Sequence, residues 1–322
     1  NPYHLAQIES CCTIAWSALC VEMLKLNGSS IAADELELTL LNSIIGMHTP
    51  TGRWATYNTP MSGVRRASPH HLVFQAREGT PELNCCSVNT PRGFGLLSDW
   101  GLMRDDLGFA LNYYGPVTFE AAWKNGVSVR FTEETEYPVD GSIRIHVEPS
   151  SPASFVLRLR IPHWSRHTEV RINGEWAPNV TPGQYLELDR EWMPGDEIEL
   201  KLDLTLHIWS GERECEGLSS IYRGPVLLAY DMRYNLEHAE SQPLETRNTG
   251  VWHNTVGDLH VPALDARRLD YESTRWEDWH QPMLLLNFTA ANGHTVRLCD
   301  FASAGDTGTH YCSWLPVENA PK

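Results

Sequence analysis

The first hundred residues of the chain repeat apolar side chains at the spacing of α-helices. Over Cys12–Leu26 they recur every three or four positions, and Asn27-Gly28 is a typical helix stop. The same pattern predicts a second helix over Ile31–Ile45 and a third over about residues 90–104, where Pro91 suits a first turn. Three helices have too few neighbours to bury their apolar stripes. The pattern therefore predicts one part of a larger helical domain.

After Gly108 the chain changes to the period-2 alternation of β-strands, which predicts a β-sandwich. The predicted strands are Val127–Phe131, Ser142–Val147, Phe155–Ile161, Glu169–Ile172, Gln184–Leu188 and Glu197–Leu202. Asn173-Gly174 is a strong signal for a hairpin turn. The alternation breaks near Trp209 and then resumes, which predicts a second β-unit. Its predicted strands are Leu218–Tyr222, Val226–Tyr230, Met283–Ala290 and Thr295–Phe301.

These changes of pattern predict three domains, at residues 1–106, 107–210 and 211–322. Residues 232–282 are polar and without a clear period, which predicts loops and insertions. The chain begins at Asn1 without an initiator Met or a signal peptide, and helical periodicity follows almost at once. We therefore expect the chain to begin inside a domain.

Composition and charge exclude several classes of function. No apolar run approaches the roughly 20 residues that span a bilayer. Twenty-five Lys and Arg residues against 41 Asp and Glu residues give a formal net charge of −16, which opposes binding to nucleic acid. Twelve Trp and 11 Tyr residues fit a carbohydrate ligand, because aromatic faces stack on sugars, but most aromatic residues serve the core.

Eight cysteines are the most informative residues in the composition. A chain of this length needs no disulfides, and two adjacent pairs are awkward disulfide partners, so metal binding or catalysis is the better interpretation. The compartment stays open: free thiols favour the cytoplasm slightly, and secretion is an alternative. Cys12 and Cys20 are expected in the core of the first helix. The remaining three, Cys215, Cys299 and Cys312, are expected as buried thiols or one chance disulfide.

Glu9, Cys11, Cys85 and Cys86 form the candidate metal site, because three thiolates and one carboxylate can fill the tetrahedral shell of zinc. Glu9 and Cys11 can share an ion only if the chain is extended there and enters the helix just afterwards. The Cys85-Cys86 pair likewise requires a turn rather than a regular helix. Spacing alone also permits a bland alternative, since free cysteines are often small buried hydrophobes.

Several motifs raise the metal interpretation above that alternative. The motif Glu9-Ser10-Cys11, the run from Cys85-Cys86 to Gly93, and the loop Tyr57-Asn58-Thr59-Pro60 resemble those of the β-L-arabinofuranosidases, glycoside hydrolase family 127 and its relatives. Further matches, in the order of the family, are Asp34 with Glu37 to Asn42, Arg160-Ile161-Pro162-His163-Trp164, Ile172-Asn173-Gly174, Tyr185 to Trp192 running into Pro194-Gly195-Asp196, and Tyr222-Arg223-Gly224-Pro225. The resemblance covers most of the chain.

The resemblance implies the C-terminal part of an (α/α)6 barrel, which would be residues 1–106, followed by two β-sandwich domains. It implies that zinc is held by Glu9, Cys11, Cys85 and Cys86. Cys85 would be the nucleophile of a retaining glycoside hydrolase, a zinc-bound thiolate that attacks the anomeric carbon of an L-arabinofuranoside or related sugar. Tyr57 would contact the substrate, although a buried loop tyrosine with a satisfied hydroxyl is the alternative.

The general acid/base Glu of such a mechanism would lie upstream of Glu9, outside this chain, so a missing N-terminal part or a second chain would complete the barrel. Ser87-Val88 replaces the Pro-Pro of many relatives, which bears on the substrate. The alternative function is a truncated or diverged non-catalytic homologue that binds carbohydrate or a partner chain and keeps a structural zinc site. His70-His71 and Trp54 are further candidates for the cleft, and Trp164 and Trp192 are expected in the sandwich core.

Overall fold

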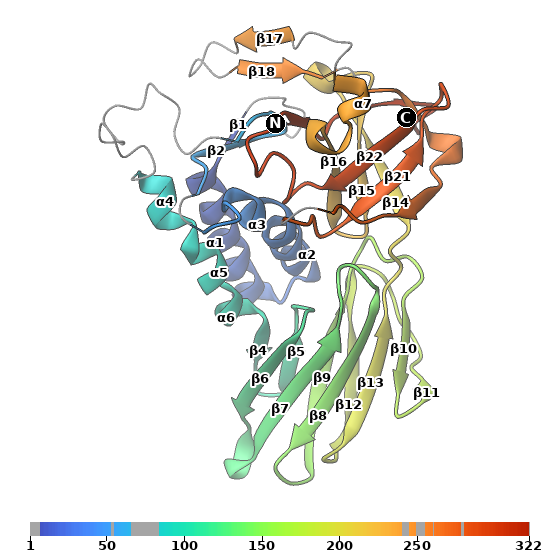
Figure 1. Cartoon of the computed structure of the whole chain (residues 1–322). Helices are drawn as coiled ribbons and strands as arrows, with labels where there is room; N and C mark the ends of the chain where they lie inside the picture. Colours follow the sequence, from blue (N-terminus) through green and yellow to red (C-terminus); the bar gives the residue numbers. More distant parts are fainter. Residues whose placement is uncertain are drawn as a thin grey trace. The chain divides into compact units, whose positions relative to one another are not determined.

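The structure, a computed structural model, describes residues 7–52, 55–65, 84–239, 245–248, 255–259, 261–277 and 280–321. Figure 1 labels many of its helices and strands. The chain forms two compact units, each built from segments that are separate in sequence. The first unit comprises Asn1–Trp16, Leu38–Phe94 and Leu206–Lys322, and the second comprises Ser17–Glu37 and Gly95–Thr205. The predicted division at residues 1–106, 107–210 and 211–322 stays a prediction.

Helices occur in the part of the chain where the apolar spacing predicts them. They are α1 (Ser10–Asn27), α2 (Ser30–Leu38), the π-helix η1 (Thr39–Ile44), α3 (Ile45–Met47), α4 (Cys85–Asn89), α5 (Pro91–Gly95) and α6 (Leu97–Trp100). The first predicted helix is confirmed by α1. The second is confirmed by α2, η1 and α3, which follow one another without a gap over the region predicted as one helix.

The third predicted helix, over residues 90–104, is wrong in its bounds. Helical structure already begins at Cys85, is divided into α4, α5 and α6, and is followed by strand β4 (Leu102–Arg104). Pro91 has no backbone N–H and cannot extend the hydrogen-bond ladder of α4, so a new helix begins there. Gly93 then allows close packing, because a Cβ atom at this position would lie 2.8 Å from the side chains of both Ile14 and Ile44.

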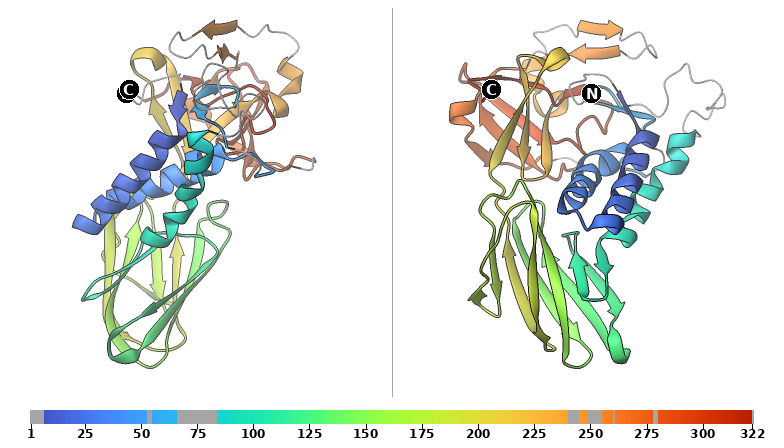
Figure 2. Two further views of the ribbon diagram at one scale, coloured as in Figure 1. Left: turned by 90° about the vertical axis from the view of Figure 1, so that its left-hand side faces the viewer. Right: turned by 180° about the vertical axis from the view of Figure 1, so that it is seen from behind.

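The second unit contains a six-stranded and a four-stranded sheet, in the orders β11-β10-β13-β8-β7-β6 and β12-β9-β5-β4. Their strands are β5 (Gly108–Leu111), β6 (Val117–Ala122), β7 (Ser128–Thr135), β8 (Ser142–Pro149), β9 (Ala153–Ile161), β10 (Glu169–Ile172), β11 (Glu175–Trp176), β12 (Gln184–Trp192) and β13 (Asp196–Lys201), with β4 at one edge. The six predicted strands are confirmed, and so is the hairpin, in which Asn173 and Gly174 both have positive φ between β10 and β11. Figure 2 shows these strands from two further sides.

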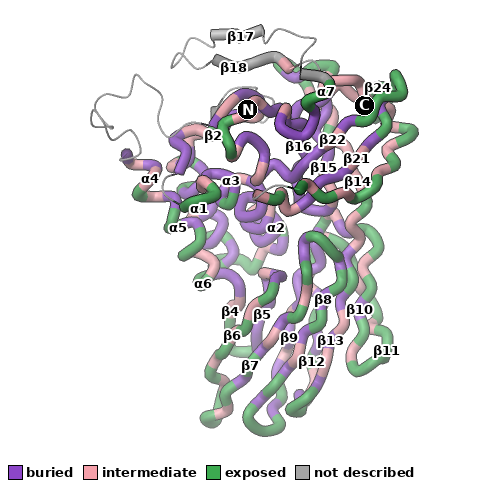
Figure 3. Tube along the Cα trace, in the orientation of Figure 1, coloured by how far each residue is buried: buried purple, intermediate pink, exposed green. Residues whose placement is uncertain are grey.

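Aromatic side chains from both sheets form the core of the second unit. The ring centroids of Phe109 on β5 and Phe131 on β7 are 5.3 Å apart, and Phe155 on β9 stacks on Trp192 at 5.7 Å. Buried and exposed residues alternate along β7 and β8, as Figure 3 shows. The period-2 pattern of the sequence thus corresponds to one face toward the core and one toward solvent.

The first unit contains a sheet of ten strands, whose main path is β19-β24-β15-β16-β22-β21-β20, with β14, β23 and β3 paired beside it. These strands are β3 (Ser62–Gly63), β14 (Leu206–Ser210), β15 (Leu218–Arg223), β16 (Val226–Asp231), β19 (Leu264–Asp265), β20 (Tyr271–Ser273), β21 (Leu285–Thr289), β22 (Thr295–Asp300), β23 (Tyr311–Cys312) and β24 (Leu315–Glu318). The four predicted strands correspond to β15, β16, β21 and β22.

The region 232–282, predicted as loops and insertions, contains short elements where the structure describes it. They are the 3-10 turns Met232–Tyr234 and Ala266–Arg268, helix α7 (Leu236–Ala239), and strands β17 (Glu245–Asn248), β18 (Thr255–Asp258), β19 and β20. These elements are too short to show a helical or strand period in the sequence. The coarse prediction of helices joined to β-sheets is confirmed.

Residues 55–65 are built into the first unit by partners far along the chain. The short strand β3 pairs with β23, with Gly63 opposite Tyr311. The Tyr311 hydroxyl donates a hydrogen bond to the carbonyl of Pro60, and the backbone N–H of Ser313 donates to that of Met61 at 2.9 Å. Strand β2 (Asn58–Pro60) pairs in turn with β1 (Gln7–Glu9). This chain of pairings fixes the backbone at the start of α1.

Candidate metal and catalytic centre

Strand β1 and helix α1 place Glu9 and Cys11. Glu9 ends the strand, opposite Asn58 of β2. Helix α1 begins at Ser10, whose backbone N–H donates to the carbonyl of Tyr57 at 2.9 Å and whose hydroxyl donates to that of Thr56 at 2.6 Å. The extended segment that turns into a helix is therefore confirmed, and Glu9 and Cys11 lie on either side of the transition.

Helix α4 carries the two adjacent cysteines. The side chain of Asn84 accepts hydrogen bonds from the backbone N–H groups of Cys86 and Ser87 at 3.0 and 3.1 Å, which caps the helix. Cys85 and Cys86 thus occupy the first turn of a helix, and the expectation of a turn outside regular helix is wrong. The sequence signal for this geometry is Asn84, an efficient N-cap residue directly before the pair.

The four predicted ligands converge in the first unit. Their ligand atoms all lie within 4.8 Å of one another. The Sγ atoms of Cys85 and Cys86 are 3.9 Å apart, close to the roughly 3.8 Å edge that a zinc–sulfur bond of about 2.3 Å gives in a tetrahedral shell. Glu9 Oε1 is 3.9 Å from the sulfur of Cys86, and Cys11 Sγ is 3.2 Å from it. Three sulfurs and one carboxylate oxygen fit a zinc-type donor set.

Burial disfavours the ionised form of the thiols in this group. Desolvation raises the pKa of the Cys86 thiol well above its usual value, and Cys86 is fully buried. Desolvation also raises the pKa of Cys11, although hydrogen bonds from Cys86 and Asn89 oppose it. A divalent cation would reverse this preference, because a coordinated thiol loses its proton. None of the four side chains of the donor set supplies such a positive charge.

Two further residues border the cluster. The Tyr57 hydroxyl lies 3.9 Å from the sulfur of Cys85, and burial raises the pKa of Tyr57 above its usual value, so it is a neutral phenol. Asn89, at the end of α4, donates from Nδ2 to the sulfur of Cys11 at 3.3 Å. Sequence reasoning identified Tyr57 and missed Asn89, whose signal is its spacing of one helical turn from Cys85 and Cys86.

The other cysteines lie outside the centre. The prediction that Cys12 belongs to the core is wrong: it is exposed, because it faces away from the buried side of α1, and its sulfur is 4.0 Å from Glu9 Oε2. Cys20 is buried as predicted. The thiols of Cys215, Cys299 and Cys312 are buried and are not joined in a disulfide, as expected for small core residues.

Of the aromatic and histidine candidates, Trp54, His70 and His71 lie outside the described residues. Trp192 belongs to the core as predicted, with no exposed surface. Trp164 is half-buried, and its indole N–H donates to Glu37 Oε2 at 3.4 Å.

A second polar cluster, in the second unit, contains several of the motif residues. Arg160 of β9 is fully buried and donates to Asp34 Oδ1 and Glu37 Oε1, both at 2.6 Å. His163 Nδ1 is 2.8 Å from Asp34 Oδ2, and the Tyr137 hydroxyl donates to Glu37 at 2.7 Å. These contacts fasten α2 to β9 within this unit. They pair opposite charges and leave no ligand set of the kind seen around Cys86.

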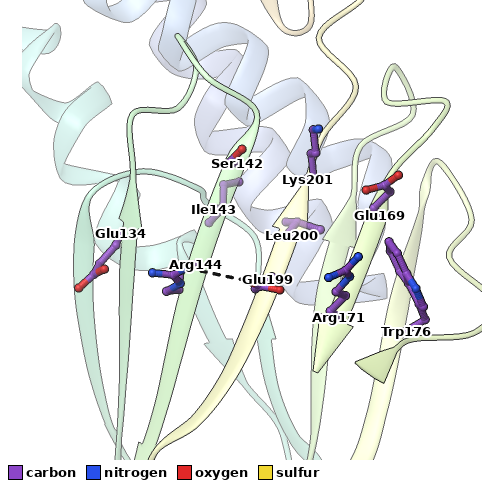
Figure 4. Close-up of a pocket in the computed structure, with 10 residues that line it drawn as sticks. All are labelled: Glu134, Ser142, Ile143, Arg144, Glu169, Arg171, Trp176, Glu199, Leu200 and Lys201. Carbon is purple, nitrogen blue, oxygen red and sulfur yellow. Dashed lines mark ion pairs between the residues drawn. The ribbon is translucent and has the colours of Figure 1, made fainter. Parts of the chain in front are cut away.

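The second unit also has a hollow of about 350 Å³ on its six-stranded sheet (Figure 4). One cross-strand row runs through it in register, from β11 to β7: Trp176, Arg171, Glu199, Arg144 and Glu134. The Arg171 guanidinium lies 4.1 Å from the centre of the half-exposed Trp176 ring, and Arg144 pairs with Glu199 at 3.7 Å. The charges alternate in sign and are solvated. This is an ion-pair ladder on a sheet face. The candidate metal ligands lie in the cysteine cluster instead.

The fold and the site together describe a protein of helices and β-sheets that carries a candidate metal–thiolate centre. Two family models match it: "Beta-L-arabinofuranosidase, GH127 catalytic domain" over residues 1–98 and "Beta-L-arabinofuranosidase, GH127 middle domain" over residues 108–204. Together they match more than half of the chain, which belongs to glycoside hydrolase family 127. The family resemblance read from the motifs is confirmed.

Individual relatives agree with this assignment. The non-reducing end β-L-arabinofuranosidase of Bifidobacterium longum subsp. longum is 26% identical over 232 residues, which are 68% of this chain and 34% of that protein. A solved GH127 β-L-arabinofuranosidase from Geobacillus stearothermophilus T6 is 21% identical with a TM-score of 0.77, covering 98% of this chain and 51% of that one. A solved GH127 β-arabinofuranosidase is 20% identical with a TM-score of 0.76, covering 97% and 50%.

At these identities the solved structures show the shared fold. The chain spans about half the length of these solved relatives and about a third of the curated one. None of the helices in the described residues is long and apolar enough to cross a membrane.

Proposed function

We propose that this chain carries the nucleophile centre of a retaining, β-L-arabinofuranosidase-like glycoside hydrolase. The observation that carries the proposal is the convergence of Glu9, Cys11, Cys85 and Cys86 within 4.8 Å. Family membership and the activity for which the relatives are named support a carbohydrate substrate. The substrate would be an arabinofuranoside-like glycan.

In this proposal Zn²⁺ is held by Glu9, Cys11, Cys85 and Cys86, and when bound it supplies the charge that keeps the sulfurs deprotonated. The Cys85 sulfur, beside the Tyr57 hydroxyl, attacks the anomeric carbon of the sugar. A carbon–sulfur bond forms while the bond to the leaving oxygen breaks, and that oxygen takes a proton from an acid group. Water then gives a proton to the same acid/base group and attacks the anomeric carbon from the face that the leaving oxygen occupied. The carbon–sulfur bond breaks, so two inversions give net retention.

Tyr57 is proposed to contact the sugar. Its hydroxyl is neutral and lies 3.9 Å from the Cys85 sulfur, a position from which it can donate a hydrogen bond to a bound substrate. Its backbone is held by α1 through the hydrogen bond from Ser10. The phenol would therefore stay fixed while the sulfur reacts.

We further propose that the acid/base Glu lies in sequence outside this chain, in a preceding segment or a second chain that completes an (α/α)6 barrel. The exposed face of α1 supports this. Leu19, Met23 and Leu26 are 52%, 41% and 84% exposed at the three- and four-residue spacing of one helix face. An apolar stripe of this kind needs another helix against it. The two β-regions, residues 107–210 and 211–322, would be the sandwich domains that follow the barrel.

An aryl β-L-arabinofuranoside with a good leaving group tests the nucleophile directly, because such a leaving group needs little help from an acid. We expect zinc in the freshly purified reduced protein and a mass increase of one pentosyl group on Cys85. When the missing part is supplied, turnover should give product with retained configuration, measured by proton NMR.

Cys85→Ser should abolish the adduct, and Cys12→Ser, which removes an exposed neighbouring thiol, should leave it unchanged. Turnover that survives in Cys85→Ser would remove Cys85 from the mechanism. Zinc without adduct or turnover in the completed protein would instead support the alternative, a carbohydrate-binding or partner-binding homologue with a structural zinc site.

A further inference from the structure

Asn89 links two of the three elements that build the centre. It closes α4, three residues after Cys86 and four after Cys85, so its side chain projects from the same side of the helical turn. From there Nδ2 reaches the sulfur of Cys11, on a different helix, at 3.3 Å. Both residues are half-buried.

The orientation of the Asn89 amide is set by a second contact. Arg92 of α5 donates from its guanidinium to Asn89 Oδ1 at 3.3 Å. A guanidinium has donors only, so the amide oxygen must face Arg92. The amide nitrogen is then left facing the sulfur, as a donor. The two hydrogen bonds therefore run in one direction, from Arg92 to Asn89 and from Asn89 to Cys11, and they end on a predicted ligand atom.

A hydrogen bond of this kind favours the anionic form of its acceptor. An N–H group stabilises a thiolate more than a neutral thiol, since charged acceptors make stronger hydrogen bonds. It also restricts the rotation of the Cys11 side chain, which keeps the sulfur directed at the other ligand atoms. Partners of this type commonly change metal affinity by about 10- to 100-fold.

We propose that Asn89 is a positioning residue that holds Cys11 as a metal ligand through its N–H···S hydrogen bond. The inference rests on the proposed metal centre and extends it to a residue outside the four ligands. Asn89 does not touch the reacting atoms in this scheme. Its effect passes through the Cys11 sulfur to the bound ion.

Metal binding by the full chain tests the inference without any substrate. Metal-free reduced protein is titrated with Co²⁺ and followed by its sulfur-to-cobalt charge-transfer absorption, and Zn²⁺ affinity is measured by competition with a chelator. Asn89→Leu keeps the volume and removes the donor. We expect its Zn²⁺ affinity to fall about 10- to 100-fold, and its charge-transfer band to move to lower energy because the sulfur loses a stabilising hydrogen bond.

Two other variants separate this role from a general effect on α4. Val88→Ala changes an exposed side chain in the same turn and should leave affinity and absorption unchanged. Arg92→Ala frees the amide to rotate but leaves the donor in place, so its loss of affinity should be smaller than that of Asn89→Leu. Circular dichroism of the metal-free proteins checks that the fold is intact.

Equal affinity and an unmoved band in a folded Asn89→Leu protein would overturn the role of Asn89 and leave the metal centre standing. A wild-type chain that binds neither Co²⁺ nor Zn²⁺ would overturn both. A fall in affinity without any change of the band would assign Asn89 to the folding of α4 rather than to the sulfur, and would overturn the inference as well.

Discussion

Two polar clusters of this molecule have opposite electrostatic characters. Around Cys86, one carboxylate and three thiols meet, and every one of these groups becomes negative when it ionises. Around Arg160, the two carboxylates of Asp34 and Glu37 meet a guanidinium and the imidazole of His163. The second cluster contains its own opposite charges, whereas the first offers only donor groups that could hold a cation. The comparison teaches that a convergent set of thiol and carboxylate donors without an opposite charge of its own marks a candidate cation site.

The largest effect is expected from Arg160→Met, which leaves two buried carboxylates without the guanidinium that pairs with both. Loss of one partner from a buried ion pair typically costs about 3–5 kcal/mol, so the free energy of unfolding in denaturant should fall by this order. Arg158→Met in the same strand is the control. Arg158 pairs with Asp105 and Glu187 at 2.9 and 3.0 Å, but both carboxylates are more than half exposed, so its loss should be small.

A fall below about 1 kcal/mol for Arg160→Met would mean that the cluster does not depend on charge pairing, since this is the range of exposed pairs. The contrast between a charge-paired cluster around Arg160 and a cluster around Cys86 without an opposite charge of its own would then fail.

The next effect is the stabilisation of the cysteine cluster by metal. With free zinc at 100 times its dissociation constant, the folded state should gain about 2.7 kcal/mol. The midpoint temperature of thermal unfolding should therefore rise with added zinc in the wild type and fall with a chelator. Cys86→Ala should remove both responses. Cys12→Ser should keep them. A zinc response that persists in Cys86→Ala would place the bound ion elsewhere.

A smaller effect is the pH dependence that His163 contributes. The hydrogen bond to Asp34 raises the pKa of His163, although burial opposes it. The stabilisation is therefore fully present below the unfolded value of about 6.5 and is lost as the pH rises through the raised folded value. In His163→Gln, the deficit in unfolding free energy should be larger at low than at high pH across this window.

The pairing of His163 with Asp34 also predicts a loss of stability at acid pH. Burial tends to raise the pKa of Asp34, but the hydrogen bond from His163 and the charge of Arg160 outweigh it and lower the pKa. This stabilisation is present above the unfolded value of about 3.9 and is lost as the pH falls through the lower folded value. Parallel stability curves for wild type and His163→Gln from about pH 3 to 9 would contradict both pH effects.

The smallest effect is expected in the hollow of Figure 4. Arg144 pairs with Glu197 at 3.3 Å and with Glu199 at 3.7 Å, and its side chain is 50% exposed. Arg144→Gln should lower the free energy of unfolding by about 0.2–1 kcal/mol, the range for exposed pairs, and the loss should shrink in high salt. A loss as large as that of Arg160→Met would show that exposure does not separate the two kinds of ion pair.

The sequence predicted those parts of the fold that depend on local periodicity. Helix α1 and strands β7 to β10, β12 and β13 follow from apolar spacing, because each buries one face of a regular element. The third helix was predicted too late, since the capping of α4 by Asn84 outweighed the weak apolar pattern around Cys85. Short strands such as β3 escape prediction because their partner, β23, lies about 250 residues away.

The sequence was enough to predict the candidate ligand residues of the centre, but not the residues that surround them. Glu9, Cys11 and the cysteine pair were identified through residue type and family motif, which need no contacts. The hydrogen bond from Asn89 to Cys11 crosses 78 residues, and the ion pair from Arg160 to Asp34 crosses 126. Such pairs follow from tertiary packing, which periodicity along one segment does not contain.

The pairing of β3 with β23 also bears on the order in which the molecule forms. The Pro60 carbonyl and the Tyr311 hydroxyl that joins it are separated by 251 residues. Contacts of such long sequence separation form late and slow the folding of a domain. During synthesis on the ribosome, the backbone that anchors Tyr57 and the start of α1 can reach its final form only after residues 311–313 have emerged. The sulfurs of Cys11, Cys85 and Cys86 precede these residues in the chain but would be assembled among the last parts of this unit.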